Sequence, residues 1–321
     1  LFLPLVVTAV CLNKSFVFSR IKYLCTMQKY DADAALAVQY LSQTAKAVEL
    51  KFDELLPSEQ EEPKRLHEAM RYSMFAGGKR LRPALVKAAF ELFGGTGDSV
   101  WYAMSALEML HTFSLIHDDL PCVDNDDMRR GKPTAHKKYG EATAVLSGDA
   151  LCILAFELMA KTGNARAIEF LASKLGTFGM LGGEMRDVEC EGKTVSLAEV
   201  DYIHYHKTAA LIEASLCIGA ELASATEEQL ASIQKFGRSI GLAFQVVDDI
   251  LDVISTTEQL GKDAGSDEER GKATYPSVIG LEASRERANA LYKEAIAELD
   301  SLPGDTSVLR SIAAFIVTRV N

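Results

Sequence analysis

Two clusters of aspartates are the residues of this chain whose types and spacing are best suited to chemistry. The first occupies residues 118–127 and holds five carboxylates; the second is Asp248-Asp249-Ile250-Leu251-Asp252, inside an apolar stretch. Asp248 and Asp252 are four residues apart, so on a helix their carboxylates lie on one face. Ionised carboxylates in apolar surroundings are costly unless a cation compensates them, and hard oxygen ligands suit Mg²⁺ or Mn²⁺. The pattern predicts a divalent metal site, with salt bridges to distant basic residues as the alternative.

The first cluster follows an apolar, helix-like run over residues 101–116. Asp118 and Asp119 would stand at the carboxyl end of that helix, where the helix dipole disfavours negative charge. Asp124 comes six residues after Asp118 and would not share its helical face. Pro121 breaks or kinks a helix, which would let Asp124 turn back towards Asp118. Taken alone, this stretch is also compatible with a solvated acidic loop.

Basic residues occur in groups that are placed to bind anions. Lys79 and Arg82 are one helical turn apart after a pair of glycines, and Arg129 and Arg130 follow the first acidic cluster. Further such residues, beside loops and helix breaks, are Lys207 with Thr208, Lys262 and Lys272. Each cation alone is typical of a solvated surface. Together they predict one cavity that binds one anion through metal ions and a second anion through direct Lys and Arg contacts.

Composition narrows the class of protein. The chain has 321 residues, of which 48% are hydrophobic, enough for one large core or two small ones. Its formal net charge of −11 argues against a nucleic-acid partner. Excess acid suits an enzyme of anionic substrates only when divalent cations mediate between them.

The first thirty residues differ from the rest of the chain. Residues 1–30 contain no Asp or Glu but several Lys and Arg, after an apolar run too short to span a bilayer. This composition is typical of a targeting segment, which would direct the protein to a plastid or another organelle. The alternative is translated upstream sequence, with Met27 as the true start and a cytoplasmic protein. In either case residues 31–321 form the folded domain, and no stable membrane span is expected.

The folded domain is predicted to consist of helices. Apolar residues recur at spacings of three and four, whereas no alternating strand or βαβ rhythm occurs. Residues 120–139 and 256–274 are expected to be loops. The fold class is therefore an all-α, single-domain bundle of roughly ten helices. The main helices are expected over residues 33–55, 63–75, 83–93, 98–116, 141–161, 165–189, 197–223, 227–253, 277–302 and 307–320.

Several motifs resemble those of the trans-prenyl diphosphate synthases. They are GGKRLRP at 77–83, LIHDDLPCVDNDDMRRGKPTAH at 115–136, HKTAALIEAS at 206–215, GLAFQVVDDILDV at 241–253 and GKATYP at 271–276. The resemblance covers nearly all of the chain after Asp33 and keeps the motifs in the family's order. It implies an all-α bundle around a deep central cavity, usually a homodimer, that condenses isopentenyl diphosphate with allylic prenyl diphosphates.

The resemblance also implies roles for individual residues. Mg²⁺, as three ions that Mn²⁺ could replace, would neutralise the leaving diphosphate, and the allylic cation would then be attacked by the double bond of isopentenyl diphosphate. The metal ligands would be Asp118, Asp119, Asp124, Asp248, Asp249 and Asp252. All of these except Asp252 would be catalytic, together with Arg129 and Lys207. Isopentenyl diphosphate would contact Gly78, Lys79, Arg82, His111 and Arg130. The allylic diphosphate would contact Arg129, Lys207, Thr208, Gln245, Lys262 and Lys272.

Two residues bear on how this chain differs within the family. Glu184 stands where the family usually has Gln, and would either alter the metal and water geometry or pair with Arg186. Phe113 lies five residues before Asp118, about 7.5 Å along a helix, where a growing product would meet its ring early. That position predicts farnesyl diphosphate (C15) as the product. Geranylgeranyl diphosphate (C20), as made by plastid and cyanobacterial synthases, is the alternative, and Phe113 would then be an ordinary core residue.

Two other classes of protein share parts of this pattern. A terpene cyclase is also all-α and Mg²⁺-dependent, but it would not need Lys79 and Arg82 for a second substrate. A non-catalytic regulatory subunit of a partner synthase would not need both aspartate clusters intact. The sequence therefore favours a catalytic prenyl transferase.

Overall fold

The computed structural model describes residues 34–254 and 271–318. Lys262 and the predicted targeting segment lie outside these residues. The main helices and the two strands follow one another in this order: α2 (Ala35–Leu55), α3 (Lys64–Met74), α4 (Leu81–Leu92), α5 (Ser99–Asp118), β1 (Met128–Arg129), β2 (Lys132–Pro133), α6 (Ala135–Tyr139), α7 (Glu141–Lys161), α8 (Ala165–Leu175), α9 (Met180–Cys190), α10 (Leu197–His204), the π-helical turn η1 (Tyr205–Ala209), α11 (Ala210–Leu222), α12 (Glu227–Ile254), α15 (Tyr275–Ile279), α16 (Leu281–Leu299) and α17 (Ser307–Val317). The all-α prediction is confirmed for the described residues.

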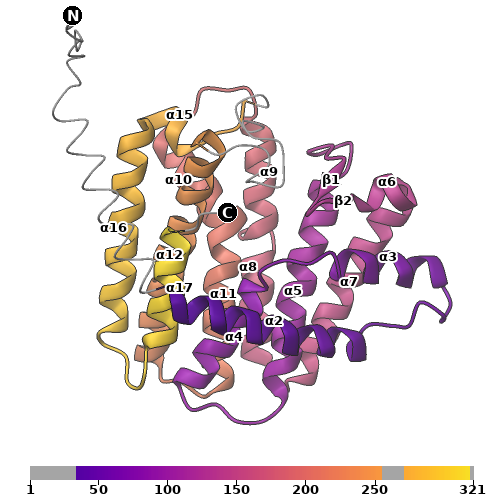
Figure 1. Ribbon diagram of the computed structural model, residues 1–321, viewed down its shortest axis with the longest axis horizontal. Coiled ribbons are helices and arrows are strands. Elements are labelled where there is room, and N and C mark those ends of the chain that lie inside the picture. Colours follow the sequence, from indigo (N-terminus) through magenta and orange to yellow (C-terminus); the bar gives the residue numbers. More distant parts are fainter. Residues whose placement is uncertain (1–33, 255–270, 319–321) are drawn as a thin grey trace, which may run out of the picture.

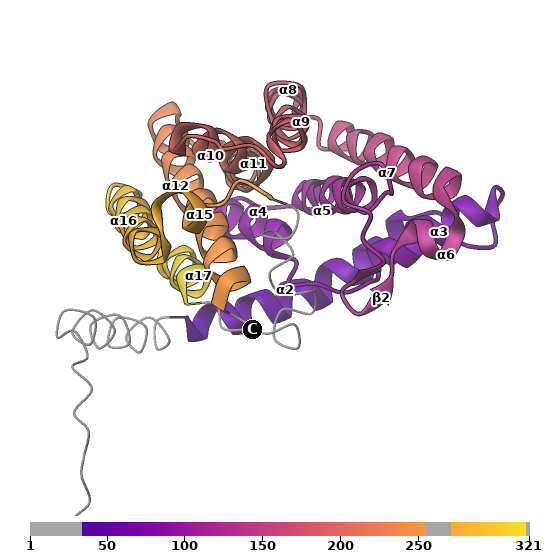
Figure 2. The same cartoon turned by 90° about the horizontal axis from the view of Figure 1, so that it is seen from above.

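Three helices, α4, α5 and α11, form the middle of the bundle (Figures 1 and 2). On one side α12 packs against α11 and α16, with α17 beside them, and on the other side α7 packs against α5. The short helices α8, α9 and α10 line one long edge, while α2 crosses the opposite side (Figure 2). The central helices therefore carry residues that face both halves of the molecule.

The central helices lie close together because their contacts use small side chains. In α11, nearly every residue is buried, which is the pattern of a helix surrounded by protein. Gly219 of α11 lies against α4, and a Cβ atom there would stand 2.1 Å from the carbonyl oxygen of Val86. This contact excludes any larger residue and fixes α11 against α4, so the residues that precede α11 are also fixed in place.

Some predicted helices are shorter than expected. The helix expected over residues 165–189 is two helices, α8 and α9, because Gly176 ends the first and Gly179 precedes the second. The helix expected over 197–223 is interrupted by η1, and the one expected over 277–302 is divided at Gly280. The loop expected over 120–139 contains a short hairpin and α6. Strands of two residues are too short to produce an alternating pattern in the sequence.

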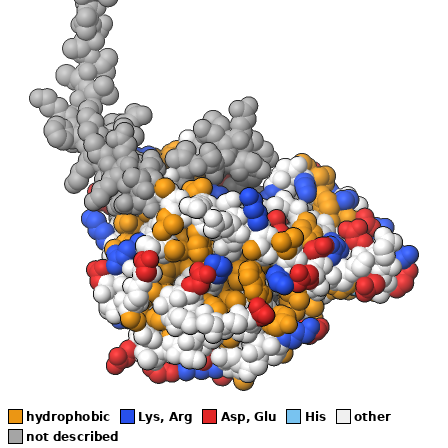
Figure 3. Space-filling model, turned by 60° about the horizontal axis from the view of Figure 1, so that its bottom comes forward, with side chains coloured by type: hydrophobic (Ala, Val, Ile, Leu, Met, Phe, Trp, Pro, Cys, Tyr) orange, Lys and Arg blue, Asp and Glu red, His pale blue; other side chains and the backbone are white. Residues whose placement is uncertain are grey.

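Among the residues that the structure describes, one helix, α7, is long and apolar enough to cross a membrane when judged by length and composition alone. Core helices of the same composition meet this criterion, and α7 places Leu151, Ala155 and Leu158 in the core beside α5. Its outer face exposes Leu146 (58%) and Ile153 (71%). On the molecular face shown in Figure 3, basic and acidic side chains are interspersed with hydrophobic ones, so the described residues form no continuous basic surface there.

Candidate active site

A cavity of about 730 Å³ opens between α5, α9, η1, α12 and the loop that carries the hairpin. Eight acidic and five basic side chains line it, so a diphosphate bound in this cavity would face more negative than positive side chains. Twelve of the residues predicted from the sequence line this one cavity: Arg82, His111, Asp118, Asp124, Arg129, Arg130, Lys207, Thr208, Gln245, Asp248, Asp249 and Lys272.

The first aspartate cluster is shaped by the end of α5. The helix ends at Asp118, directly before the segment that contains Pro121. The backbone N–H of Asp124 donates a hydrogen bond to the carbonyl oxygen of Asp118 at 2.8 Å. This bond confirms that the chain turns back after the helix, and it brings Asp124 beside Asp118 at the cavity wall.

The hairpin after this cluster positions two arginines. Arg130 and Gly131 form its tip with positive φ values of 52° and 72°, as the two-residue turns that match strand twist require. Arg129 on β1 forms ion pairs with Asp119 and, at 2.9 Å, with Asp126. Arg130 donates to the carbonyl oxygen of Gly77. The hairpin therefore connects the acidic cluster to the glycine-rich loop before α4.

The second aspartate cluster lies on α12. Asp249 is held on both carboxylate oxygens: Gln245 donates to Oδ1 at 3.1 Å, and the backbone N–H of Tyr275 donates to Oδ2 at 2.9 Å. His204 Nε2 lies 3.5 Å from the same Oδ2. Asp248 lines the cavity, whereas Asp252, one turn further along, is buried outside it. The cluster thus places Asp248 and Asp249 at the cavity, with Asp249 held by hydrogen bonds, and Asp252 in the core.

The π-helical turn η1 carries Lys207 and Thr208 into the cavity. An extra residue in a helical turn is a frequent feature of functional sites. Gly183 of α9 permits this turn, because a Cβ atom there would stand 2.3 Å from the backbone nitrogen of Lys207. Thr208 Oγ1 donates to Gln245 Oε1 at 2.9 Å, so η1 is also tied to α12.

Lys207 is enclosed by acidic residues of α9. Its Nζ lies 2.7 Å from Asp187 and 2.8 Å from Glu184. The prediction left open whether Glu184 would pair with Arg186; instead Arg186 forms ion pairs with Glu189 and Glu199. Glu184 therefore contributes its charge to the cavity.

Burial dominates the protonation of the cavity residues. It raises the pKa of Asp118 to about 7, with the charge of Glu184 acting in the same direction and Lys207 opposing it. Burial also holds the pKa of His111 well below its ordinary value, supported by the nearby cations Arg82 and Arg130. Burial lowers the pKa of Arg82 to about 10, so Arg82 stays charged at neutral pH. The wall beside α4 thus combines charged guanidinium groups with a neutral imidazole.

Some predicted residues lie beside the cavity instead of lining it. Lys79 places its ammonium group 5.5 Å from the centre of the Phe315 ring. Gly78 adjoins Arg130, and a Cβ atom there would stand 2.8 Å from Arg130 Cζ. Phe113 is buried, with its ring centre 4.8 Å from that of His117, while its neighbour Ser114 lines the cavity. Asp119, like Asp252, does not line the cavity.

Other residues of the cavity were not predicted. Asp187 and His204 contact predicted residues directly, as described above, and Ser114 lines the cavity. A signal for Asp187 existed, because it follows Glu184 by three positions and so shares its helical face. His204 gave no such signal, since its contact with Asp249 joins helices that are distant in the sequence.

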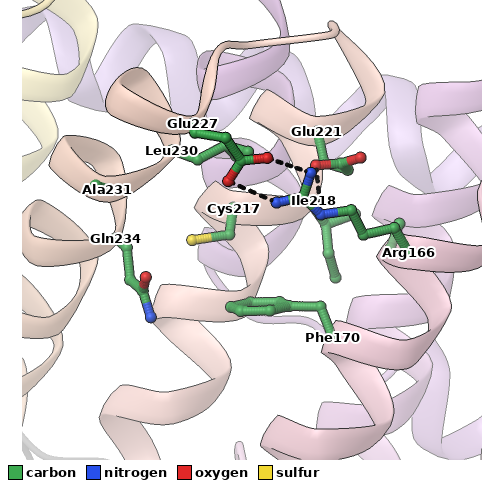
Figure 4. A pocket seen from close by; sticks show the side chains of 10 residues that line it. Arg166, Phe170, Cys217, Ile218, Glu221, Glu227, Leu230, Ala231 and Gln234 are labelled. Atoms are coloured by element: carbon green, nitrogen blue, oxygen red, sulfur yellow. Dashed lines mark hydrogen bonds and ion pairs between the residues drawn. The ribbon is translucent and has the colours of Figure 1, made fainter.

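A second, smaller cavity of about 160 Å³ lies between α8, α11 and α12 (Figure 4). Its cation is Arg166, which pairs with Glu227 at 2.6 Å and with Glu221 at 3.5 Å (Figure 4). Because these acids already compensate Arg166, and the walls include Phe170, Ile218 and Leu230, this cavity does not suit a diphosphate.

Comparisons with known proteins agree on one family. The model of the polyprenyl synthetase family matches residues 63–307. The chloroplastic geranylgeranyl pyrophosphate synthase of Capsicum annuum is 44% identical, over 100% of this chain and 87% of its own length. The chloroplastic large subunit 1 of the heterodimeric geranylgeranyl pyrophosphate synthase of Arabidopsis thaliana is 46% identical, over 88% and 80%. A crystal structure of a polyprenyl synthase from Caulobacter crescentus, complexed with calcium and isoprenyl diphosphate, is similar with a TM-score of 0.81 and 31% identity, over 88% of this chain and 98% of its own.

Proposed function

Because the chain belongs to the polyprenyl synthetase family and is a short-chain prenyltransferase of isoprenoid biosynthesis, we propose that its large cavity joins isopentenyl diphosphate to allylic diphosphates to give geranylgeranyl diphosphate. The observation that carries this proposal is the gathering of both aspartate clusters and five cations around one cavity. An enzyme with two anionic substrates needs both kinds of group in one cavity: carboxylates that bind metal ions for one substrate, and Lys and Arg side chains that bind the other directly.

The aspartates at the cavity fit a divalent metal. Asp118, Asp124 and Asp248 offer the hard oxygen ligands that Mg²⁺ prefers and Mn²⁺ accepts. Within residues 34–254 and 271–318, no group of three or more His, Cys, Asp or Glu side chains is placed to hold an ion by itself, so oxygens of the substrate diphosphate would have to complete the coordination. We propose three Mg²⁺ ions, held by these residues with Asp119, Asp249 and Asp252 nearby. Bound there, the metal would stabilise negative charge on the leaving diphosphate.

The cations divide between the two substrates. On the allylic side, Arg129, Lys207 and Lys272, which line the cavity, donate to the diphosphate. Thr208 and Gln245, which are hydrogen-bonded to each other at the cavity wall, would stabilise the positive charge that develops when the C–O bond breaks. On the other side Arg82 and Arg130 hold isopentenyl diphosphate, with Lys79 and the backbone at Gly78. His111, neutral at pH 7, adds a hydrogen bond without adding charge.

This arrangement accounts for the bond changes of the reaction. The allylic C–O bond breaks and its electron pair leaves with the diphosphate. The double bond of isopentenyl diphosphate then forms a new C–C bond to the allylic carbon, and a proton passes to the departing diphosphate. The side chains keep the two substrates adjacent and exclude water from the cation, which water would otherwise capture.

The relatives and the residues of α5 support the proposed product length. Relatives that match 88% to 100% of this chain are named geranylgeranyl pyrophosphate synthases. The small side chain of Ser114 lines the cavity, while the ring of Phe113 packs against His117, which favours C20. The buried position of Phe113 so near Asp118 is the observation that favours C15, as predicted from the sequence.

The exposed apolar face of α7, with Leu146 and Ile153, supports a homodimer. The relatives named as chloroplastic support import into a plastid. Sedimentation of the wild-type protein and of Ile153→Glu would test the proposed homodimer, because the added charge on α7 should shift the dimer towards a monomer. A monomeric wild-type protein would refute the proposed homodimer.

Imaging residues 1–30 fused to a reporter tests the proposed import into a plastid, and a diffuse cytosolic signal would refute that import.

Activity is tested with labelled isopentenyl diphosphate, dimethylallyl diphosphate and Mg²⁺. We expect a linear C20 diphosphate, and loss of product in Asp248→Asn. A C15 product would refute the proposed product length but not the proposed condensation reaction. No incorporation, or a cyclic hydrocarbon, would refute the proposed function itself.

A further inference from the structure

Glu184 of α9 occupies a position in which its charge acts on the allylic side of the cavity. Its carboxylate lies 2.8 Å from Lys207 Nζ, and the side chain is 20% exposed, so it faces the cavity without being solvated like a surface residue. Gly183 lets α9 approach η1 so closely that a Cβ atom there would stand 2.3 Å from the backbone nitrogen of Lys207, so Glu184 and Lys207 project from adjacent stretches of backbone.

The ion pair leaves this part of the wall with an excess of negative charge. Glu184 and Asp187 together place two carboxylates on the single ammonium group of Lys207, and the carboxylate of Asp118 lies close enough to be influenced by Glu184. Arg186, the nearest cation in the sequence, pairs with Glu189 at 3.0 Å instead. An incoming diphosphate must therefore compete with two carboxylates for Lys207.

We propose that Glu184 is a positioning residue that withholds Lys207 from the allylic diphosphate until divalent cations are bound, and so makes binding of that substrate strictly dependent on metal. This inference rests on the proposed function, because it assigns Lys207 to the allylic diphosphate. The added charge strengthens the attraction of the wall for metal ions, and it weakens the attraction for a free anion.

The family's usual residue at this position provides the comparison. Glutamine has nearly the same size and can still accept a hydrogen bond from Lys207, but it carries no charge. With Gln, Lys207 would keep only Asp187 as an ionic partner. A diphosphate without metal would then find a more attractive site.

The test measures binding of inorganic diphosphate by calorimetry, so it does not depend on turnover. In EDTA we expect Glu184→Gln to bind diphosphate about tenfold more tightly than the wild type, and we expect this advantage to shrink in saturating Mg²⁺. Glu184→Asp, which keeps the charge, should stay near the wild type. Glu189→Gln, on the same helix but paired with Arg186 at the surface, is the matched control and should not change binding.

Several outcomes would overturn the inference. Equal affinities of wild type and Glu184→Gln in EDTA would do so, and so would an equal gain in Glu189→Gln or a gain that persists unchanged in Mg²⁺. If Glu184→Gln does not fold, Glu184→Asp and Asp187→Asn decide: the inference then requires tighter binding only where a charge is removed. A wild type that fails to condense its substrates would instead refute the proposed function, which is a separate result.

Discussion

Replacing Asp118 with Asn should stabilise the metal-free protein while weakening its response to metal. Burial and the nearby charge of Glu184 raise the pKa of Asp118 to about 7. Above that pH the carboxylate is ionised in a place that disfavours its charge, and the folded protein is less stable for it. Asparagine has the same shape and no charge, so Asp118→Asn removes this unfavourable contribution and also a metal ligand.

The size of the effect follows from the pKa. The pKa of Asp118 rises from 3.8 to about 7, a change of about three units, and each unit corresponds to about 1.4 kcal/mol. The resulting limit of about 4 kcal/mol is too high, because Asp118 is only partly buried and faces a cavity where solvent screens it. We therefore expect about 1–2 kcal/mol, which raises Tm by roughly 2–6 °C in a domain of this size.

The size of the gain in stability from Asp118→Asn depends on pH. Between the unfolded value of 3.8 and the folded value of about 7, the folded protein binds more protons than the unfolded chain. The stability of the wild type therefore falls as pH rises through this window. The advantage of Asp118→Asn should be largest at pH 8 and fall to less than half at about pH 5.

The assay is thermal unfolding by circular dichroism in EDTA at pH 8 and pH 5, repeated with Mg²⁺. Asp127→Asn is the control, because Asp127 is 70% exposed and pairs with Lys137 at the surface; it should change stability by less than about 0.5 kcal/mol. Mg²⁺ should raise Tm of the wild type more than that of Asp118→Asn. The reasoning is refuted if Asp118→Asn is no more stable than the wild type at pH 8, or if its gain is equal at both pH values.

Three further substitutions have defined outcomes. Gly78→Ala strains a backbone with φ of +127° and displaces Arg130, 2.8 Å from the added Cβ, so KM for isopentenyl diphosphate should rise about tenfold with a smaller change in kcat; steady-state kinetics with unchanged KM would contradict this. Phe113→Ala should leave the C20 product unchanged, because Phe113 packs against His117 and does not line the cavity; a longer product, seen by chromatography of the hydrolysed prenols, would show that Phe113 limits growth. Arg80→Met breaks a buried ion pair of 2.9 Å with Glu108 and should lower the free energy of unfolding by about 3–5 kcal/mol; the double variant with Glu108→Met should recover part of this loss in urea titrations, and full additivity would be the contrary result.

The sequence is informative where chemistry depends on residues that are close along the chain. The helical spacing of apolar residues predicts the bundle. Pro121 predicts the turn that returns Asp124 to Asp118. Each of these depends on local geometry, which the spacing of residue types encodes directly.

The sequence is less informative where one residue has a choice of partners. Glu184 could have paired with Arg186 nearby, yet it pairs with Lys207. The reason is that α9 packs against η1 with the face that carries Glu184 directed towards Lys207. The extra residue of the π-helical turn likewise depends on how α11 is fixed between α4 and α12. These choices are settled by packing between distant helices, which no spacing within a single segment specifies.

The hydrogen bond from Arg130 to the carbonyl oxygen of Gly77 joins two loops to which the proposed function assigns different substrates. Arg129, the residue before it, is attached to the acidic cluster, while Gly77 precedes the cations of α4. Ordering either loop by its own ligand therefore reduces the freedom of the other, which is a thermodynamic coupling between two sites. Such coupling is reciprocal: if the allylic diphosphate improves the affinity for isopentenyl diphosphate by some factor, isopentenyl diphosphate must improve the affinity for the allylic diphosphate by the same factor.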